Sequence, residues 1–117
     1  MKVDLHNHSY YSDGVFSPTE VVRFADEAGC DLFALTDHDT TDGLDEARQT
    51  ADKFSVNLVS GVEISSFWRN MTIHIIGLDI EINNDILQAG LVIINNFEKR
   101  GLKKSHLDFI VQVSKMP

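Results

Sequence analysis

The chain has 117 residues, of which 43% are hydrophobic and 24% charged, and its formal net charge is −8 at pH 7. This is the composition of one globular domain and not of a disordered chain. The excess of acidic residues argues against a surface for duplex DNA, because such surfaces are built from Lys and Arg. A phosphorylated ligand stays compatible with this charge if metal ions supply positive charge locally.

Apolar runs and cysteine content point to a cytoplasmic protein with no membrane partner. No apolar stretch approaches the roughly 20 residues that span a bilayer, and polar residues interrupt the N-terminal stretch where a signal peptide would be apolar. The single cysteine, Cys30, excludes an intrachain disulfide framework.

The first elements in chain order are a strand, a helix and a second strand. Residues 2–5 predict a short strand, followed by a loop with an Asp-Gly turn signal. The segment SPTE (17–20) has the pattern of a capping box with proline at the first helical position. It predicts a helix to about Ala28, ended by Gly29. The apolar run 31–36 predicts a buried strand.

The later elements complete a pattern in which strands alternate with helices. They are a helix over 44–54, strands over 56–65 and 72–81, a long helix from Asn83 or Asn84 to about Arg100 stopped by Gly101, and an amphipathic helix over about 103–115. This order predicts an α/β fold that begins with parallel strands. In such folds, ligands bind beyond the carboxyl ends of the strands.

Imidazole and carboxylate side chains gather at these predicted strand ends. His6 and His8 follow the first strand, residues 37–39 follow the second, Glu63 lies near the end of the third, and His74 lies within the fourth. In an extended segment, residues two apart point to the same side, so His6 and His8 can share one ion. These ligand types suit Zn²⁺, Mn²⁺ or Fe²⁺.

Each of these motifs has a structural explanation when it is taken alone. A His-x-His pair can be hydrogen-bonded or face solvent, TDHD (36–39) can be a cap and a turn, and His74 can be a core histidine among isoleucines. Together they are costly to bury at one sheet end without a cation. The pattern therefore predicts a site for more than one metal ion. His106 lies outside it.

The motifs DLHNHSYYSDG, LTDHDT, GVEIS and IHIIGLDIE resemble the N-terminal motifs of the PHP (polymerase and histidinol phosphatase) superfamily. Within it, the chain is most similar to the stand-alone bacterial phosphoesterases that include 3′,5′-nucleoside bisphosphate phosphatases and 5′→3′ exoribonucleases. The segment GLDEA and the position of Trp68 are typical of that group. The resemblance is dense over residues 2–82.

The resemblance implies a distorted (β/α)7 barrel that holds up to three divalent metal ions at the carboxyl ends of its strands. By that resemblance, His6 and His8 bind one ion, and Asp13 and His38 bind another. Glu63 would bridge two ions. His74 would complete one of the ligand sets. Mn²⁺ is the expected metal, and Zn²⁺, Fe²⁺ and Mg²⁺ stay open.

The implied reaction is hydrolysis of a phosphate ester by metal-activated hydroxide, with Asp13, His38 and Glu63 as catalytic residues. Asp37 and Asp39 would fix loops and orient the imidazoles. The implied substrates are the 3′-phosphate of nucleoside 3′,5′-bisphosphates and the 5′ ends of short RNA. A histidinol phosphatase and a non-catalytic PHP module or remnant are the alternatives.

Two motifs of the family, an AHP-like histidine and an Asp-x-His pair, have no match in the 117 residues. We therefore expect residues 1–82 to be the N-terminal part of the barrel and 83–117 to begin a helical region, with the C-terminal barrel half absent. A truncated or fragmentary half-barrel is expected to bind metals weakly and to self-associate through its exposed edge.

Overall fold

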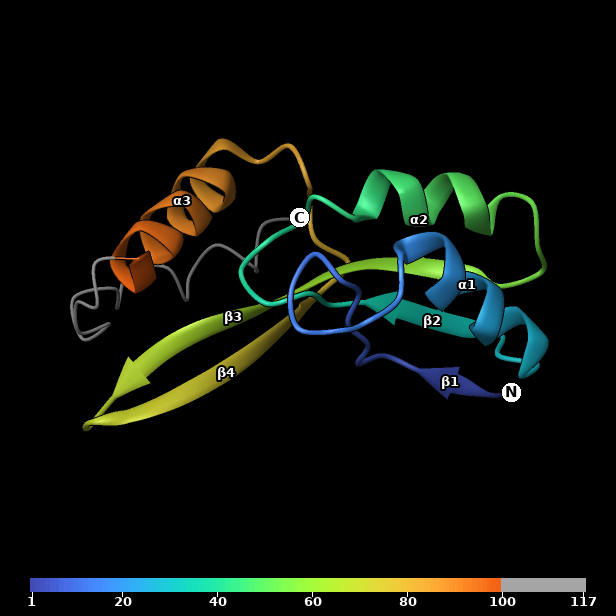
Figure 1. Cartoon of the computed structure of the whole chain (residues 1–117), viewed down its shortest axis with the longest axis horizontal. Coiled ribbons are helices and arrows are strands. Elements are labelled where there is room, and N and C mark those ends of the chain that lie inside the picture. The colour runs from blue at the N-terminus through green and yellow to red at the C-terminus, as the bar shows by residue number, and fades with distance from the viewer. Residues whose placement is uncertain (100–117) are drawn as a thin grey trace.

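The structure is a computed structural model, and it describes residues 1–99. Its elements in chain order are β1 (Val3–Asp4), α1 (Pro18–Glu27), β2 (Leu32–Leu35), α2 (Leu44–Ala51), β3 (Asn57–Trp68), β4 (Met71–Leu78) and α3 (Asp85–Lys99). The strands form one sheet in the order β1-β2-β3-β4. The sheet curls as part of a barrel wall, with β3 and β4 extending away from the parallel part (Figure 1). The predicted α/β class is confirmed.

Strand direction changes at the last strand. β1, β2 and β3 run parallel, as predicted, whereas β3 and β4 form an antiparallel hairpin. Only Arg69 and Asn70 connect these two strands, and both have positive φ angles, 50° and 64°. A connection this short cannot make the crossover that a parallel pair needs.

Local sequence chemistry explains where α1 begins and ends. The Ser17 hydroxyl accepts a hydrogen bond from the Glu20 amide at 3.1 Å, and the Glu20 carboxylate accepts one from the Ser17 amide at 3.3 Å. This is the predicted capping box, with Pro18 at the first helical position. Past the end of the helix, Gly29 has a φ of 76°. A glycine adopts this conformation at little cost.

Several element ends differ from the prediction. β1 has two residues instead of four, α2 ends at Ala51 rather than at residue 54, and β4 ends at Leu78 rather than at residue 81. The larger difference is β3, which continues to Trp68 because it pairs with β4 as far as Trp68 opposite Met71. At the other end of that pairing, Asp79 adopts a left-handed φ of 55°, which ends β4.

Two apolar clusters hold the elements together. The first lies between the two N-terminal helices and the parallel strands and contains Val22, Ala25, Cys30, Phe33, Leu35, Leu44, Ala47, Ala51 and Val56. The second joins β3 to α3 and contains Val62, Ile64, Leu87, Leu91 and Ile94. Asn84 caps α3, because its side-chain oxygen accepts a hydrogen bond from the Leu87 amide at 2.9 Å.

Two predicted features fall beyond this part of the chain. The end of the long helix at Gly101 and the amphipathic helix over 103–115, with His106, lie outside the described residues. Within residues 1–99, no helix has both the length and the apolar character that crossing a bilayer requires.

Candidate metal centre

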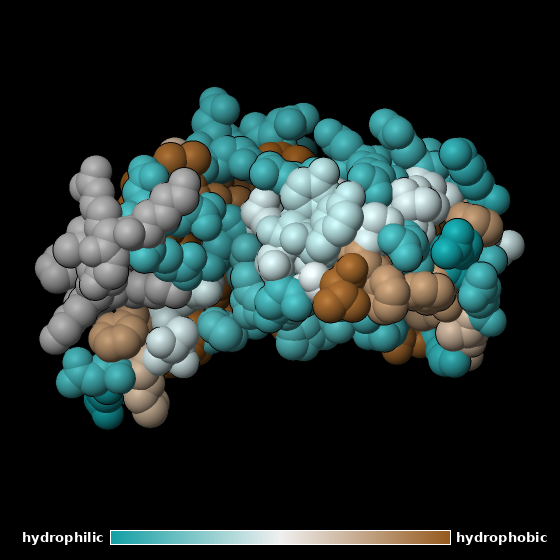
Figure 2. Space-filling view, viewed as in Figure 1, coloured by the Kyte–Doolittle hydropathy of each residue, from teal (hydrophilic) through white to brown (hydrophobic). Residues whose placement is uncertain are grey.

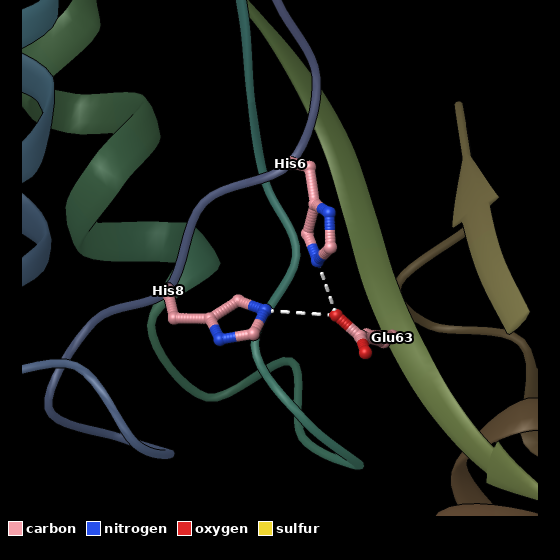
Figure 3. A group of neighbouring side chains, drawn as sticks. All are labelled: His6, His8 and Glu63. Atoms are coloured by element: carbon pink, nitrogen blue, oxygen red, sulfur yellow. Dashed lines mark hydrogen bonds and ion pairs between the residues drawn. The ribbon is translucent and has the colours of Figure 1, made fainter. Parts of the chain in front are cut away.

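The centre of the site is the carboxylate of Glu63, on β3, which is 3% exposed. Its Oε1 lies 2.5 Å from His6 Nε2 and 2.9 Å from His8 Nε2 (Figure 3). Its Oε2 lies 2.9 Å from His74 Nδ1 and 3.6 Å from His38 Nδ1. One buried carboxylate therefore contacts the imidazoles of four histidines that come from three separate segments of the sequence.

A second carboxylate, that of Asp13, approaches two of the same imidazoles. Its Oδ1 lies 2.5 Å from His8 Nδ1, and its Oδ2 lies 3.2 Å from His38 Nε2. His8 and His38 each stand between Asp13 and Glu63. The six residues predicted as metal ligands thus come together beyond the carboxyl ends of β1 and β2. Glu63 was expected near the end of its strand but lies within β3, because β3 continues to Trp68.

The six residues form three overlapping groups, each with one ligand atom per residue and all of these atoms within 4.8 Å of one another. The groups are His6, His8 and Glu63; His8, Asp13 and His38; and His38, Glu63 and His74. Each group shares residues with the other two. Neighbouring cations held by shared ligands are the arrangement of two-metal hydrolytic sites.

The first two histidines are positioned by the asparagine between them. The Asn7 carbonyl accepts a hydrogen bond from the Thr36 amide at 2.8 Å, and the Asn7 side chain donates to the Ala34 carbonyl at 3.2 Å. These bonds hold residues 6–8 beside the end of β2. His6 and His8, on either side of Asn7, both reach the same Glu63 oxygen.

The other ligands are positioned by strand pairing. His38 pairs with Glu63 in a parallel bridge, in which the Asp39 amide donates to the Glu63 carbonyl at 3.0 Å. On β4, His74 lies opposite Ser65. Because side chains alternate along a strand, His74, Ser65 and Glu63 share one face of the hairpin. The opposite face of β3 contributes to the core with α3.

The two other aspartates of the predicted site hold the surrounding backbone. Asp37, 2% exposed, accepts hydrogen bonds at 2.6 Å from the amide and hydroxyl of Ser9 and from the hydroxyl of Ser12. It thereby fixes the loop that carries Asp13. Asp39, with a φ of 57°, accepts a bond from the Ser65 amide at 2.7 Å. Their predicted role in orienting imidazoles stays a prediction.

Several residues that support the site were not identified from the sequence. Asn7, Ser9 and Ser12 lie inside the DLHNHSYYSDG motif, and their polar character was the available signal. Asn95 on α3 donates from its side chain to the Asp39 carbonyl at 3.0 Å. Nothing in the sequence linked that helix to the site.

The charges of the site are coupled. Burial of the His8 ring acts to lower its pKa, but hydrogen bonds to Asp13 and Glu63 raise the pKa above its ordinary value. For Glu63, burial acts to raise the pKa, and the hydrogen bonds from His6 and His8 outweigh it, so the pKa is lowered. The pKa of Asp13 is lowered in the same way, mainly by His8.

The donor set fits a divalent cation. His8 has one ring nitrogen against an oxygen of Asp13 and the other against an oxygen of Glu63. A neutral imidazole carries a single N–H. The second nitrogen therefore directs a lone pair at an oxygen unless a proton or a cation lies between them. Imidazole nitrogen with carboxylate oxygen suits Mn²⁺, Zn²⁺ and Fe²⁺.

Comparison with known proteins identifies the family. The PHP domain matches residues 4–113. The chain belongs to the PHP domain family. This confirms the resemblance that the N-terminal motifs indicated.

Individual members of this family share long stretches with the chain. It is 50% identical over 80 residues to the 5′-3′ exoribonuclease of Haemophilus influenzae, covering 68% of this chain and 29% of that protein. It is 46% identical over 89 residues to the 3′,5′-nucleoside bisphosphate phosphatase of Chromobacterium violaceum, covering 76% of this chain and 31% of that protein. The PHP chain therefore spans about a third of the length of these relatives.

A solved structure supports the fold. The chain superimposes with a TM-score of 0.81, at 27% identity, on a protein of Bifidobacterium adolescentis described as a metal-dependent phosphoesterase. The match covers 86% of this PHP chain and 35% of that protein.

Proposed function

We propose that this PHP chain carries metal-ligating residues of a phosphoesterase, and that its substrates are nucleoside 3′,5′-bisphosphates, which lose the 3′-phosphate, and the 5′ ends of short RNA. One observation carries the proposal. The buried Glu63 carboxylate belongs to two of three overlapping groups of candidate metal ligands and contacts His8 and His38 of the third. The names of the two curated relatives support the choice of substrate.

Each residue of the site has a definite task in this proposal. Glu63 offers one oxygen to the pair His6 and His8 and the other to His38 and His74. It would therefore fix the spacing of two neighbouring cations. Asp13 joins His8 and His38 at a further position. Bound divalent ions supply positive charge to the phosphoryl oxygens and lower the pKa of water.

Burial and loop anchoring keep this arrangement ready for substrate. Glu63 is screened from solvent, so its interaction with a cation is stronger than that of an exposed carboxylate. Asp37 holds the loop that ends in Asp13, although the Asp13 side chain itself is 63% exposed. The exposed carboxylate marks the side from which a ligand can approach.

Elemental analysis and a substrate comparison test the proposal. The purified chain is loaded with Mn²⁺, and phosphate release from adenosine 3′,5′-bisphosphate is compared with release from histidinol phosphate. We expect bound metal and a preference for the nucleotide. Preference for histidinol phosphate would favour the alternative enzyme, and bound metal without turnover would favour the non-catalytic module.

The ligand assignment is tested by His8→Ala, because His8 belongs to two of the three groups. The variant is expected to lose at least one equivalent of bound Mn²⁺, measured by elemental analysis after dialysis. His106→Ala is the matched control, because the sequence places His106 outside the motifs. Unchanged metal content in His8→Ala would show that the site is assigned wrongly.

A further inference from the structure

A cleft of about 410 Å³ opens beside the metal-ligating groups. Three of the proposed ligands line it, namely Asp13, His38 and His74, and Tyr11 stands beside them. The volume lies within the range of small-molecule sites. Tyr11 is the one Phe, Tyr or Trp among the described residues of this lining, and the proposed metal chemistry gives it no task.

The backbone around Tyr11 is held by hydrogen bonds to Ser9 and Asp37. Its amide donates to the Ser9 hydroxyl at 3.2 Å, and Ser9, fully buried, donates to Asp37 through both its amide and its hydroxyl. On the other side of Tyr11, the Ser12 hydroxyl also donates to Asp37. A ring carried on such a loop loses little conformational entropy when a ligand binds.

The Tyr11 ring is supported at its edge and still exposed. A Cβ atom at Gly43 would stand 3.1 Å from Tyr11 Cδ2, so the bare glycine leaves room for the ring. Tyr10 meets Tyr11 edge to face, with ring centroids 5.3 Å apart. Tyr11 is nevertheless 44% exposed. The space-filling view shows pale and brown areas on an otherwise hydrophilic surface (Figure 2).

The charges of the residues that line the cleft indicate where the phosphate and the uncharged part of a ligand can bind. Asp13, Asp39 and Glu98 line it, and none of the described lining residues is Lys or Arg. An anionic phosphate is therefore held only next to bound cations. The uncharged part of the ligand takes the remaining space, where Tyr11 offers an aromatic face.

We propose that Tyr11 stacks on the nucleobase of the substrate, so that the site selects phosphate esters carrying an aromatic base. This inference rests on the proposed function and adds the group that distinguishes a nucleotide from a simple sugar phosphate. Stacking on an aromatic side chain tolerates every base, because every base has a π-face. The site would thus accept nucleotides with little regard to which base they carry.

Calorimetric titration with two probes tests the proposal, using Mn²⁺-loaded protein. Adenosine 3′,5′-bisphosphate carries a base, and ribose 5-phosphate does not. Tyr11→Ala is expected to bind the nucleotide about tenfold more weakly or worse and to bind ribose 5-phosphate as the unchanged protein does. Tyr11→Phe keeps the ring and is expected to keep nucleotide affinity. Phe54→Ala is the matched control, because Phe54 is a partly exposed aromatic residue that does not line the cleft.

The outcomes separate this inference from the proposed function. Nucleotide binding that depends on Tyr11 without phosphate release would support the stacking site and contradict the phosphoesterase. Phosphate release with a KM for the nucleotide that Tyr11→Ala leaves unchanged would support the enzyme and overturn the stacking site. Equal losses on both probes, a similar loss in Phe54→Ala, or no nucleotide binding by the unchanged protein would also overturn it.

Discussion

Asp37→Ala probes the support of the site without touching a proposed ligand. The Asp37 carboxylate accepts three hydrogen bonds of 2.6 Å, two from Ser9 and one from Ser12. Hydrogen bonds to a charged group contribute ~1.5–3 kcal/mol each, and a buried donor left without a partner costs ~1–3 kcal/mol. The two hydroxyls can rotate toward other acceptors, whereas the Ser9 amide cannot. We therefore expect a loss of about 3 kcal/mol in the free energy of unfolding.

Chemical and thermal denaturation measure this loss. For a domain of this size, 1 kcal/mol corresponds to about 4–8 °C in Tm, so the expected decrease exceeds about 10 °C. Mn²⁺ affinity is expected to fall as well, because the loop that ends in Asp13 loses its anchor. Asp42→Ala is the control, since Asp42 is exposed in the adjacent loop. A decrease below 1 kcal/mol in Asp37→Ala, or an equal decrease in the control, would refute this reasoning.

Two further predictions concern the same part of the fold. In metal-free protein, the raised pKa of His8 stabilises the fold below the ordinary pKa of 6.5, and this stability is lost as pH rises through the pKa of the folded state. The lowered pKa values of Asp13 and Glu63 stabilise the fold above their ordinary values of 3.8 and 4.5. That stability is lost as pH falls through the pKa values of the folded state. Tm measured in EDTA is thus expected to be highest between pH 4.5 and 6.5, and a Tm that keeps rising above pH 6.5 would contradict this. Gly61→Ala is expected to destabilise the fold by about 1–3 kcal/mol in urea denaturation, because its Cβ would stand 2.7 Å from Thr36 Cγ2; unchanged stability would show that the strands yield at no cost.

Local chemistry made part of this structure predictable. The start of α1 depends on Ser17, Pro18 and Glu20, which are neighbours in the sequence, and the structure has the predicted cap. The gathering of the His and Glu side chains was predictable because such groups are costly to bury together without a cation, and their role as metal ligands stays a prediction. The parallel strands brought the residues after β1 and β2 beside β3, as the order of the elements predicted, whereas His74 reaches the cluster through the antiparallel β3–β4 hairpin.

The features that sequence reasoning missed depend on contacts between distant residues. The length of β3 is set by its partner β4, and its pairing to Trp68 is not encoded in the segment 66–68 alone. Asn95 reaches Asp39 across 56 positions of sequence. Asp37 binds serines of a preceding loop, a choice of partner that the motif LTDHDT does not reveal.

Adjacent residues of β3 point to opposite faces of the strand, one toward the imidazole cluster and one toward the apolar core. Glu63 and Ser65 face the imidazoles, while Val62 and Ile64 lie in the core with α3. If β3 shifted by one position against β2, isoleucine and valine would enter the ligand cluster and a carboxylate would enter the apolar core. Cation binding by this cluster and packing of α3 therefore both require the same register of β3 against β2. A chain in which these residues bind a cation would therefore also have β3 in the register that packs α3.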